Sequence, residues 1–153
     1  MKTVFADTAY WVAVFRPRDQ WRSAARFALR QLGSVNIVTT DEVLTEFLAS
    51  ASRGGPEVRL SAVRSVRELQ NNPRVRVMPQ SRESFRKALD RYAARTDKSY
   101  SLQDCVSMNV MEAQSITEIL TSDRQFEQEG FTVLMKRASA RSKSVQDDFP
   151  RPG

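Results

Sequence analysis

Short apolar runs alternate along this chain with longer stretches in which apolar residues recur at helical spacing. The short runs predict strands over 4–6, 35–38, 74–78, 116–122 and 131–135. Helical spacing predicts helices over 19–32, 41–53, 57–70, 81–95 and 101–114. Strands and helices that alternate in this way form a mostly parallel sheet covered on both faces, so we expect an α/β three-layer sandwich with about five strands.

Two patterns refine the sheet and its cover. The segment 74–78 alternates arginine with valine and methionine, which is the period of a strand with one face in water, so we expect it at a sheet edge. The helix over 81–95 carries an apolar stripe that we expect to face the core. This stripe consists of Phe85, Ala88, Leu89, Tyr92 and Ala93.

The length of 153 residues and the hydrophobic content of 41% suit one domain with one core. We expect this domain to span 1–137 and to be followed by a polar, flexible tail over 138–153, which has few apolar side chains. No apolar run approaches the ~20 residues that cross a bilayer. The N-terminus reaches Asp7 before a signal-peptide core could form, so we expect a cytoplasmic protein that does not bind membranes.

The chain has no histidine and a single cysteine, Cys105. These counts exclude Ser-His-Asp and Cys-His hydrolases, HExxH metalloproteases, an internal disulfide and a structural zinc site. Acid–base or metal chemistry must therefore depend on carboxylates, whose hard oxygens suit magnesium or manganese.

Charge is distributed unevenly along the sequence. Residues 53–98 hold twelve basic and five acidic side chains, whereas 99–135 hold one basic and six acidic side chains. This distribution suits a protein that holds a polyanion with one surface and cations with another. A set of solvated, arginine-rich helix faces would explain it equally well.

Four acids fall at places where they could converge. Asp7 and Asp123 each follow a predicted inner strand, at the carboxyl end where open α/β sheets bind ligands. Glu46 lies one turn into the helix after the second strand, and Asp104 lies in the first turn of the helix before the fourth.

Each acid also has a purely structural explanation. Asp104 and Ser101 have the spacing of a capping box, and Asp123 could be a turn residue. Glu46 could be an ordinary surface residue, although its neighbour at i−4 is Glu42, which gives it no helical ion pair. Asp7 is the hardest to explain structurally, because a carboxylate directly after a buried strand costs desolvation energy.

Four motifs in order carry a family resemblance. They are Val4-Phe5-Ala6-Asp7-Thr8, Leu44-Thr45-Glu46-Phe47, Ser101-Leu102-Gln103-Asp104-Cys105 and Leu120-Thr121-Ser122-Asp123-Arg124-Gln125-Phe126. Over about 1–136 the chain resembles the PIN-domain nucleases, especially the VapC-like toxins of prokaryotic toxin–antitoxin systems. The resemblance implies the PIN-like α/β fold and a metal-dependent endoribonuclease that hydrolyses RNA phosphodiester bonds.

The resemblance also implies roles for individual residues. Asp7, Glu46, Asp104 and Asp123 would form an acidic catalytic site that holds Mg²⁺ or Mn²⁺, and Ser122 would help to order it. Many relatives have an acid directly before the phenylalanine of the last motif, where this chain has Gln125. This difference leaves open whether one metal or two is bound.

Expected partners follow from the same resemblance. Basic residues of 53–98 would hold single-stranded or looped RNA, and Tyr10, Trp11 and Phe15 could stack bases, although an apolar helix stripe is the alternative role for Trp11 and Phe15. A cognate antitoxin would lay an amphipathic helix into an apolar groove and extend a basic side chain toward the acids. Trp11, Phe15 and Trp21 could form this groove, contact a second copy in a homodimer, or lie in the core.

Two other classes of function fit parts of the sequence. A noncatalytic PIN-like module that binds RNA or protein would use the basic middle of the chain, but it would not need four acids. A phosphoryl-transfer domain of receiver or haloacid-dehalogenase type would place an acid at Asp7. However, Asp7-Thr8-Ala9 lacks the second acid of a DxD motif.

Overall fold

A five-stranded parallel sheet forms the centre of the molecule in the computed structural model, which describes residues 1–137. The strands lie in the order β3-β2-β1-β4-β5, and every neighbouring pair is parallel. Their bounds are β1 (Lys2–Ala6), β2 (Val35–Thr40), β3 (Val75–Met78), β4 (Glu118–Leu120) and β5 (Thr132–Val133). The expected parallel sheet and the edge position of the third strand are confirmed. The predicted tail over 138–153 lies outside the described residues.

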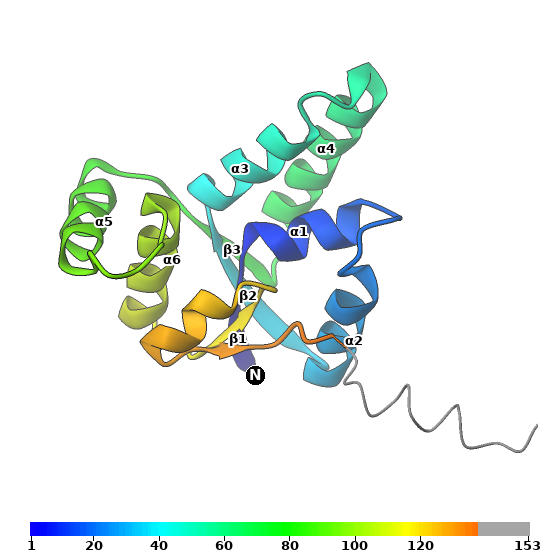
Figure 1. The fold of residues 1–153 in the computed structure, drawn as a ribbon. Helices are drawn as coiled ribbons and strands as arrows, with labels where there is room; N and C mark the ends of the chain where they lie inside the picture. The colour runs from blue at the N-terminus through cyan, green and yellow to red at the C-terminus, as the bar shows by residue number, and fades with distance from the viewer. Residues whose placement is uncertain (138–153) are drawn as a thin grey trace, which may run out of the picture.

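Helices cover both faces of this sheet (Figure 1). They are α1 (Thr8–Phe15), α2 (Arg22–Leu32), α3 (Asp41–Ala51), α4 (Gly55–Asn71), α5 (Arg82–Ala94), α6 (Leu102–Ala113) and the 3-10 helix η1 (Arg124–Glu129). Figure 1 shows α5 and α6 on one side, α1 and α2 on the other, and α3 with α4 extending past one end of the sheet. Within residues 1–137, none of these helices combines the length and the apolar character that a membrane crossing needs.

Alternate side chains of the inner strands enter two separate cores. Phe5, Val38 and Ile119 pack with α6 on one face. Val4, Ile37 and Leu120 pack with α1 and α2 on the other. Because both faces are covered, consecutive apolar residues in a strand are all buried, which explains why the strands read as continuous apolar runs.

Helix α5 departs from the prediction. Of its expected core stripe only Ala88 is buried, whereas Phe85, Leu89 and Tyr92 are 45%, 44% and 54% exposed and Ala93 is also exposed. The stripe was wrong because α5 packs against α6 rather than on the sheet.

Ion pairs complete the attachment of α5. The Arg91 guanidinium lies 2.7 Å from Glu129 Oε1 in η1 and donates to Asn109 of α6 over the same distance. Helical spacing predicts an apolar stripe, but it does not show how much of that stripe a neighbouring helix or sheet will cover.

The strand order creates a switch point beside β1. The chain runs from β1 outward through β2 and β3, then returns to build β4 and β5 on the other side. The Asp7 backbone N–H donates to the Leu120 carbonyl oxygen over 3.1 Å, so the ends of β1 and β4 lie side by side. Open parallel sheets bind ligands in the crevice at this place, where connections leave in opposite directions.

Candidate active site

All four acids singled out in the sequence line one pocket of about 460 Å³, which we call the acidic pocket. Four segments contribute them: Asp7 follows β1, Glu46 lies on α3, Asp104 lies on α6 and Asp123 follows β4. The structure therefore brings together side chains that are more than a hundred residues apart in sequence.

Asp7 lies deepest in the acidic pocket. Its side chain is 7% exposed, and Oδ2 accepts a hydrogen bond of 3.1 Å from the Thr121 hydroxyl. Burial, together with the neighbouring charges of Asp104 and Glu46, raises the pKa of Asp7 to about 7, while hydrogen bonds from Thr8 and Thr121 oppose the shift. The chain thus holds one carboxyl that is ready to gain or lose a proton near neutral pH.

Asp104 is both a helix cap and a pocket acid. Its Oδ2 accepts from the Ser101 backbone N–H over 2.9 Å, and its own N–H donates to Ser101 Oγ over 3.0 Å, which completes a capping box. Partial burial raises the pKa of Asp104, the Ser101 bonds lower it, and the charge of Asp123 raises it. The capping explanation is confirmed, and it is compatible with a role in the pocket, because the cap occupies one carboxylate oxygen and leaves the other for the pocket.

Asp123 is fixed by the turn that follows β4. Its Oδ1 accepts from the Gln125 backbone N–H over 2.9 Å, and its Oδ2 accepts from the Gln125 side-chain amide over 3.3 Å. The Asp123 N–H donates in turn to Thr121 Oγ1 over 3.1 Å. Gln125 therefore orients the last carboxylate through both its backbone and its side-chain N–H groups and adds no charge of its own.

Thr121 links two of the acids through one buried hydroxyl. It donates to Asp7 and accepts from the backbone of Asp123, and its side chain is fully buried. Ser122, expected to order the site, makes no side-chain hydrogen bond with other described residues. The role of Ser122 stays a prediction, and Thr121 next to it was not singled out from the sequence because its contact with Asp7 crosses 114 residues.

Glu46 is the most exposed of the four acids. Desolvation raises its pKa, and the charge of Asp104 raises it further. A carboxylate at the pocket mouth with a raised pKa can exchange protons with solvent more readily at neutral pH than an ordinary glutamate.

The donor set of the pocket fits a hard divalent cation. Its acidic side chains offer only oxygens. The charges of Asp104 and Glu46 raise the pKa of Asp7, and the charge of Asp104 raises that of Glu46, a repulsion that a cation relieves. Among residues 1–137, no three acidic or cysteine side chains stand close enough to enclose an ion without rearrangement. The acids therefore share a pocket but not a preformed coordination shell, and side-chain rotation would have to complete the shell.

Three further residues of the pocket were not expected from the sequence. Asp19 and Trp21, from the turn before α2, line it together with Gln103 of α6. The Gln103 amide donates to the Thr8 hydroxyl over 3.2 Å and so joins α6 to α1 beside Asp7. Gln103 lies next to Asp104 in the motif, so proximity could have suggested it. Asp19 and Trp21 had no comparable signal, because only the path of the turn brings them to the pocket.

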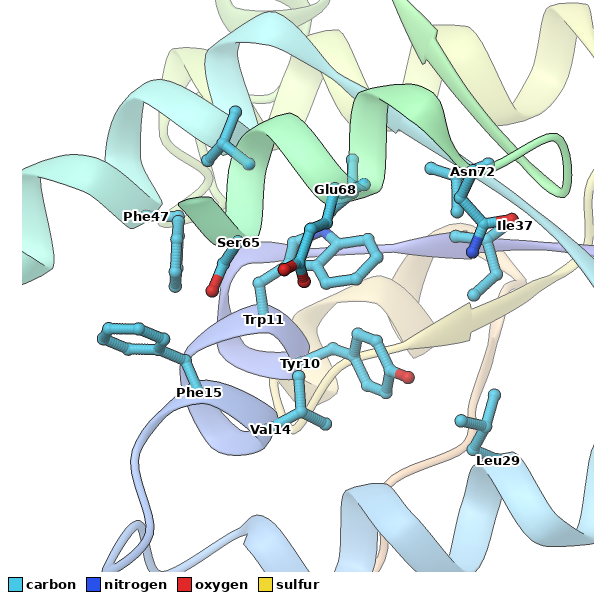
Figure 2. Close-up of a pocket in the computed structure, with 13 residues that line it drawn as sticks. Tyr10, Trp11, Val14, Phe15, Leu29, Ile37, Phe47, Ser65, Glu68 and Asn72 are labelled. Carbon is cyan, nitrogen blue, oxygen red and sulfur yellow. The ribbon is translucent and has the colours of Figure 1, made fainter. Parts of the chain in front are cut away.

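A second, apolar pocket of about 350 Å³ lies between α1, α4 and the sheet. Its wall includes Tyr10, Trp11 and Phe15 of α1 and Phe47 of α3, as Figure 2 shows, with Glu68 of α4 beside them. The Trp11 indole N–H donates to Thr39 Oγ1 over 3.2 Å, which anchors this wall to β2. We call this hollow the apolar pocket. It contains two of the three residues expected in a groove, while the third, Trp21, lines the acidic pocket instead.

Comparisons with known proteins agree with this architecture. The structure resembles that of VapC20 from Mycobacterium tuberculosis, described as a Sarcin-Ricin loop cleaving toxin, with a TM-score of 0.75 and 23% identity over 87% of this chain and 99% of that one. No curated protein sequence matches the chain. The family model of the PIN domain matches residues 4–131, which include all four acids of the pocket. This chain therefore belongs to the PIN-domain family.

Proposed function

We propose that this PIN-domain protein is a Mg²⁺- or Mn²⁺-dependent endoribonuclease and the toxin of a toxin–antitoxin pair. The observation that carries the proposal is the convergence of Asp7, Glu46, Asp104 and Asp123 on one pocket at the switch point of the sheet. The fold similarity to VapC20, a Sarcin-Ricin loop cleaving toxin, supports the same reaction class.

The three aspartates would hold the cation, each from a different support. Thr121 fixes Asp7, the capping box fixes Asp104 and Gln125 fixes Asp123, so these carboxylates have limited freedom to turn away. When bound, the divalent ion supplies Lewis acidity toward the phosphate and offsets the repulsion among the carboxylates.

Glu46 would either complete the ligand set or take the proton of the attacking water. Its exposure at the pocket mouth gives water access to the carboxylate, and its raised pKa makes it a better base near neutral pH. No histidine competes for this role anywhere in the chain.

The RNA backbone would be held by basic side chains of 53–98. Arg59, Arg64 and Arg67 are exposed on α4, and α4 packs against α3, which carries Glu46. An RNA strand that leaves the acidic pocket along α3 would thus meet the positive charges on the neighbouring helix α4. Such contacts make binding salt-dependent and independent of sequence.

The test is cleavage of a mixed RNA pool with Mg²⁺, with Mn²⁺ and with chelator. We expect cleavage by the wild type only with a divalent ion, and a loss of at least about 100-fold in Asp104→Asn and Asp7→Asn. The matched control is Asp90→Asn, which removes an exposed acid of α5 outside the pocket and should leave cleavage unchanged. Metal-independent cleavage, or full activity in both pocket variants, would contradict the proposal. RNA binding without any cleavage would favour the noncatalytic module.

A cognate antitoxin would occupy the apolar pocket with an amphipathic helix. The apolar and acidic pockets both use residues of α1 and α3, so a basic side chain of such a helix would have to extend past α1 to approach the acids. Glu68 at the apolar pocket offers a further partner for a cation. Co-expression with the product of an adjacent small reading frame should give a complex with the wild type but not with Leu69→Asp, in which a charge lines the pocket, while that variant keeps its RNA cleavage.

A homodimer would use the exposed stripe of α5, formed by Phe85, Leu89 and Tyr92. Both signs of charge flank the stripe, with Arg86 and Asp90 on the same helix, so two antiparallel copies can pair opposite charges. Sedimentation should show a dimer for the wild type and a monomer for Leu89→Arg, and a monomeric wild type would contradict this contact.

A further inference from the structure

Trp21 is the only aromatic side chain among the described residues that line the acidic pocket. None of the lining residues in this part of the chain is lysine or arginine, whereas five are carboxylic acids, Asp19 included. A phosphate that approaches the pocket therefore meets no basic side chain on its walls. Apart from a bound cation, uncharged contacts are then the ones on these walls that can add binding energy beside the reacting bond.

The local structure holds Trp21 firmly at the pocket wall. Its backbone N–H donates to Asp19 Oδ1 over 2.8 Å, and its carbonyl oxygen accepts from the Ala25 N–H over 2.8 Å. These bonds fix Trp21 at the first turn of α2. The side chain is half-buried, with part of the ring packed on the core beneath α2.

Arg137 covers the indole from one side. Its guanidinium carbon lies 4.8 Å from the ring centroid, and the guanidinium also hydrogen-bonds the Gln20 side chain. The ring is therefore covered by a cation on one side, and part of the side chain lines the hollow that contains Asp7 and Asp104. A ring fixed in this way stacks on a planar group without a large loss of side-chain entropy.

We propose that Trp21 is the stacking platform for an unpaired RNA base next to the scissile phosphate. The inference rests on the proposed ribonuclease function and names how its substrate is held. Aromatic rings bind every base through its π-face, so this contact gives affinity without strict sequence preference.

The proposal replaces the stacking residues suggested by the sequence. Tyr10, Trp11 and Phe15 line the apolar pocket, not the acidic one, and Tyr10 is only 3% exposed. Their rings are occupied by contacts with one another and with Phe47, including edge-to-face pairs at 4.9 Å and 5.2 Å between ring centroids. A base at the acids could not reach them without displacing this packing.

The first experiment uses the unmodified protein and a short single-stranded uridine oligonucleotide, with Ca²⁺ in place of Mg²⁺ and a gel to show that the RNA stays intact. A second oligonucleotide has the same length and charge but abasic ribose at every position. Tryptophan emission is recorded during each titration. We expect quenching and tight binding with the uridine oligonucleotide, and about five- to 100-fold weaker binding without quenching for the abasic one.

Matched variants test whether the Trp21 indole is the ring that stacks on the base. Trp21→Leu keeps apolar bulk but removes the π-face, and it should bind the uridine oligonucleotide about as weakly as the wild type binds the abasic one. Trp21→Phe keeps a ring and should restore most of the affinity. The control is Phe27→Ala, which removes a 57% exposed ring from the same helix outside the acidic pocket and should change nothing.

The outcomes separate this proposal from the ribonuclease assignment. Equal binding of uridine and abasic oligonucleotides by the wild type, or wild-type affinity in Trp21→Leu, would overturn stacking while RNA cleavage persists. Absence of cleavage with every cation would instead remove the proposed function on which the inference depends.

Discussion

The acidic and apolar pockets lie on opposite sides of α1 and differ in the interactions between their lining side chains. Thr8, Ala9 and Val12 face the acidic pocket, and Tyr10, Trp11, Val14 and Phe15 face the apolar one. The aromatic side chains of the apolar pocket pack edge-to-face against one another. The acidic pocket gathers carboxylates, and the charge of Asp104 raises the pKa of both Asp7 and Glu46. Helix α1 thus separates a wall held by apolar packing from a wall of carboxylates whose mutual repulsion a bound cation would reduce.

This difference shows which physical variable determines the stability of each pocket. Packing energy depends on side-chain volume and responds little to pH or metal, whereas clustered carboxylates respond to both. Substitutions in the two pockets should therefore have different signatures, and the following experiments compare them in order of expected effect.

The largest effect on stability should come from the apolar pocket. Phe47 is 3% exposed and meets Phe15 edge-to-face, so Phe47→Ala should lower the free energy of unfolding by about 3–5 kcal/mol. Urea denaturation should show this loss equally with and without Mg²⁺. The exposed Phe27→Ala is the control and should change stability by less than about 0.5 kcal/mol. A loss that Mg²⁺ restored would mean that the two pockets are coupled.

Removal of the buried charge at Asp7 should stabilise the protein. Because the folded pKa is about 7 against an ordinary value near 3.9, the folded protein keeps a proton that the unfolded chain releases between these values. In chelator, wild-type stability should therefore fall as pH rises through this window, by up to about 4 kcal/mol.

Asp7→Asn should abolish that fall and be more stable than the wild type at about pH 8. Thermal unfolding in chelator at about pH 5 and pH 8 measures the effect. Asp90→Asn should keep the wild-type pH dependence. A wild type whose stability rises over the same range would show that Asp7 is not the controlling group.

Thr121→Val should have an intermediate effect that appears in both stability and activity. The substitution keeps the shape but removes the donor to Asp7 and the acceptor for the Asp123 N–H. We expect about 1–3 kcal/mol of destabilisation and about 10- to 100-fold slower RNA cleavage, with a higher Mg²⁺ requirement. Thr132→Val, at an exposed threonine of β5, is the matched control. Unchanged Mg²⁺ dependence would assign Thr121 to folding alone.

The smallest effect should come from a charge beside the apolar pocket. Glu68 is exposed, so Glu68→Gln should change the free energy of unfolding by less than about 0.5 kcal/mol at any pH. Chemical denaturation near pH 5 and about pH 8 measures it against Asp7→Asn. A pH-dependent change as large as that of Asp7 would remove the contrast between the two pockets.

Most of the fold could be predicted because its signals are local. The apolar strand runs and the helical spacing depend on neighbouring residues, and so do local helix ends such as the Thr40 N-cap, whose hydroxyl accepts from the Val43 N–H. The helix α1 was not delimited from the sequence, because its apolar residues face two pockets and show no single stripe. The stripe of α5 was misassigned because only α6 determined how much of it would be covered.

The acids of the site were predictable for a similar reason, whereas their supports were not. Asp7 and Asp123 follow inner strands, and Asp104 and Glu46 occupy fixed positions in helices, so their places along the chain are visible in the sequence. Thr121 and Gln103 act through partners that are 114 and 95 residues away. No local pattern reports such a pairing.

The sequence by itself determined the alternation of strands and helices, the absence of histidine and the positions of the four acids along the chain. Those properties follow from residue type and short spacing, which the chain has before it folds. Only the tertiary structure decided that Thr121 joins two acids, that Trp21 stands among them and that α5 leaves its stripe in water. These outcomes depend on the strand order and on which surfaces pack together, because distant segments come into contact only when β2 and β4 pair with β1.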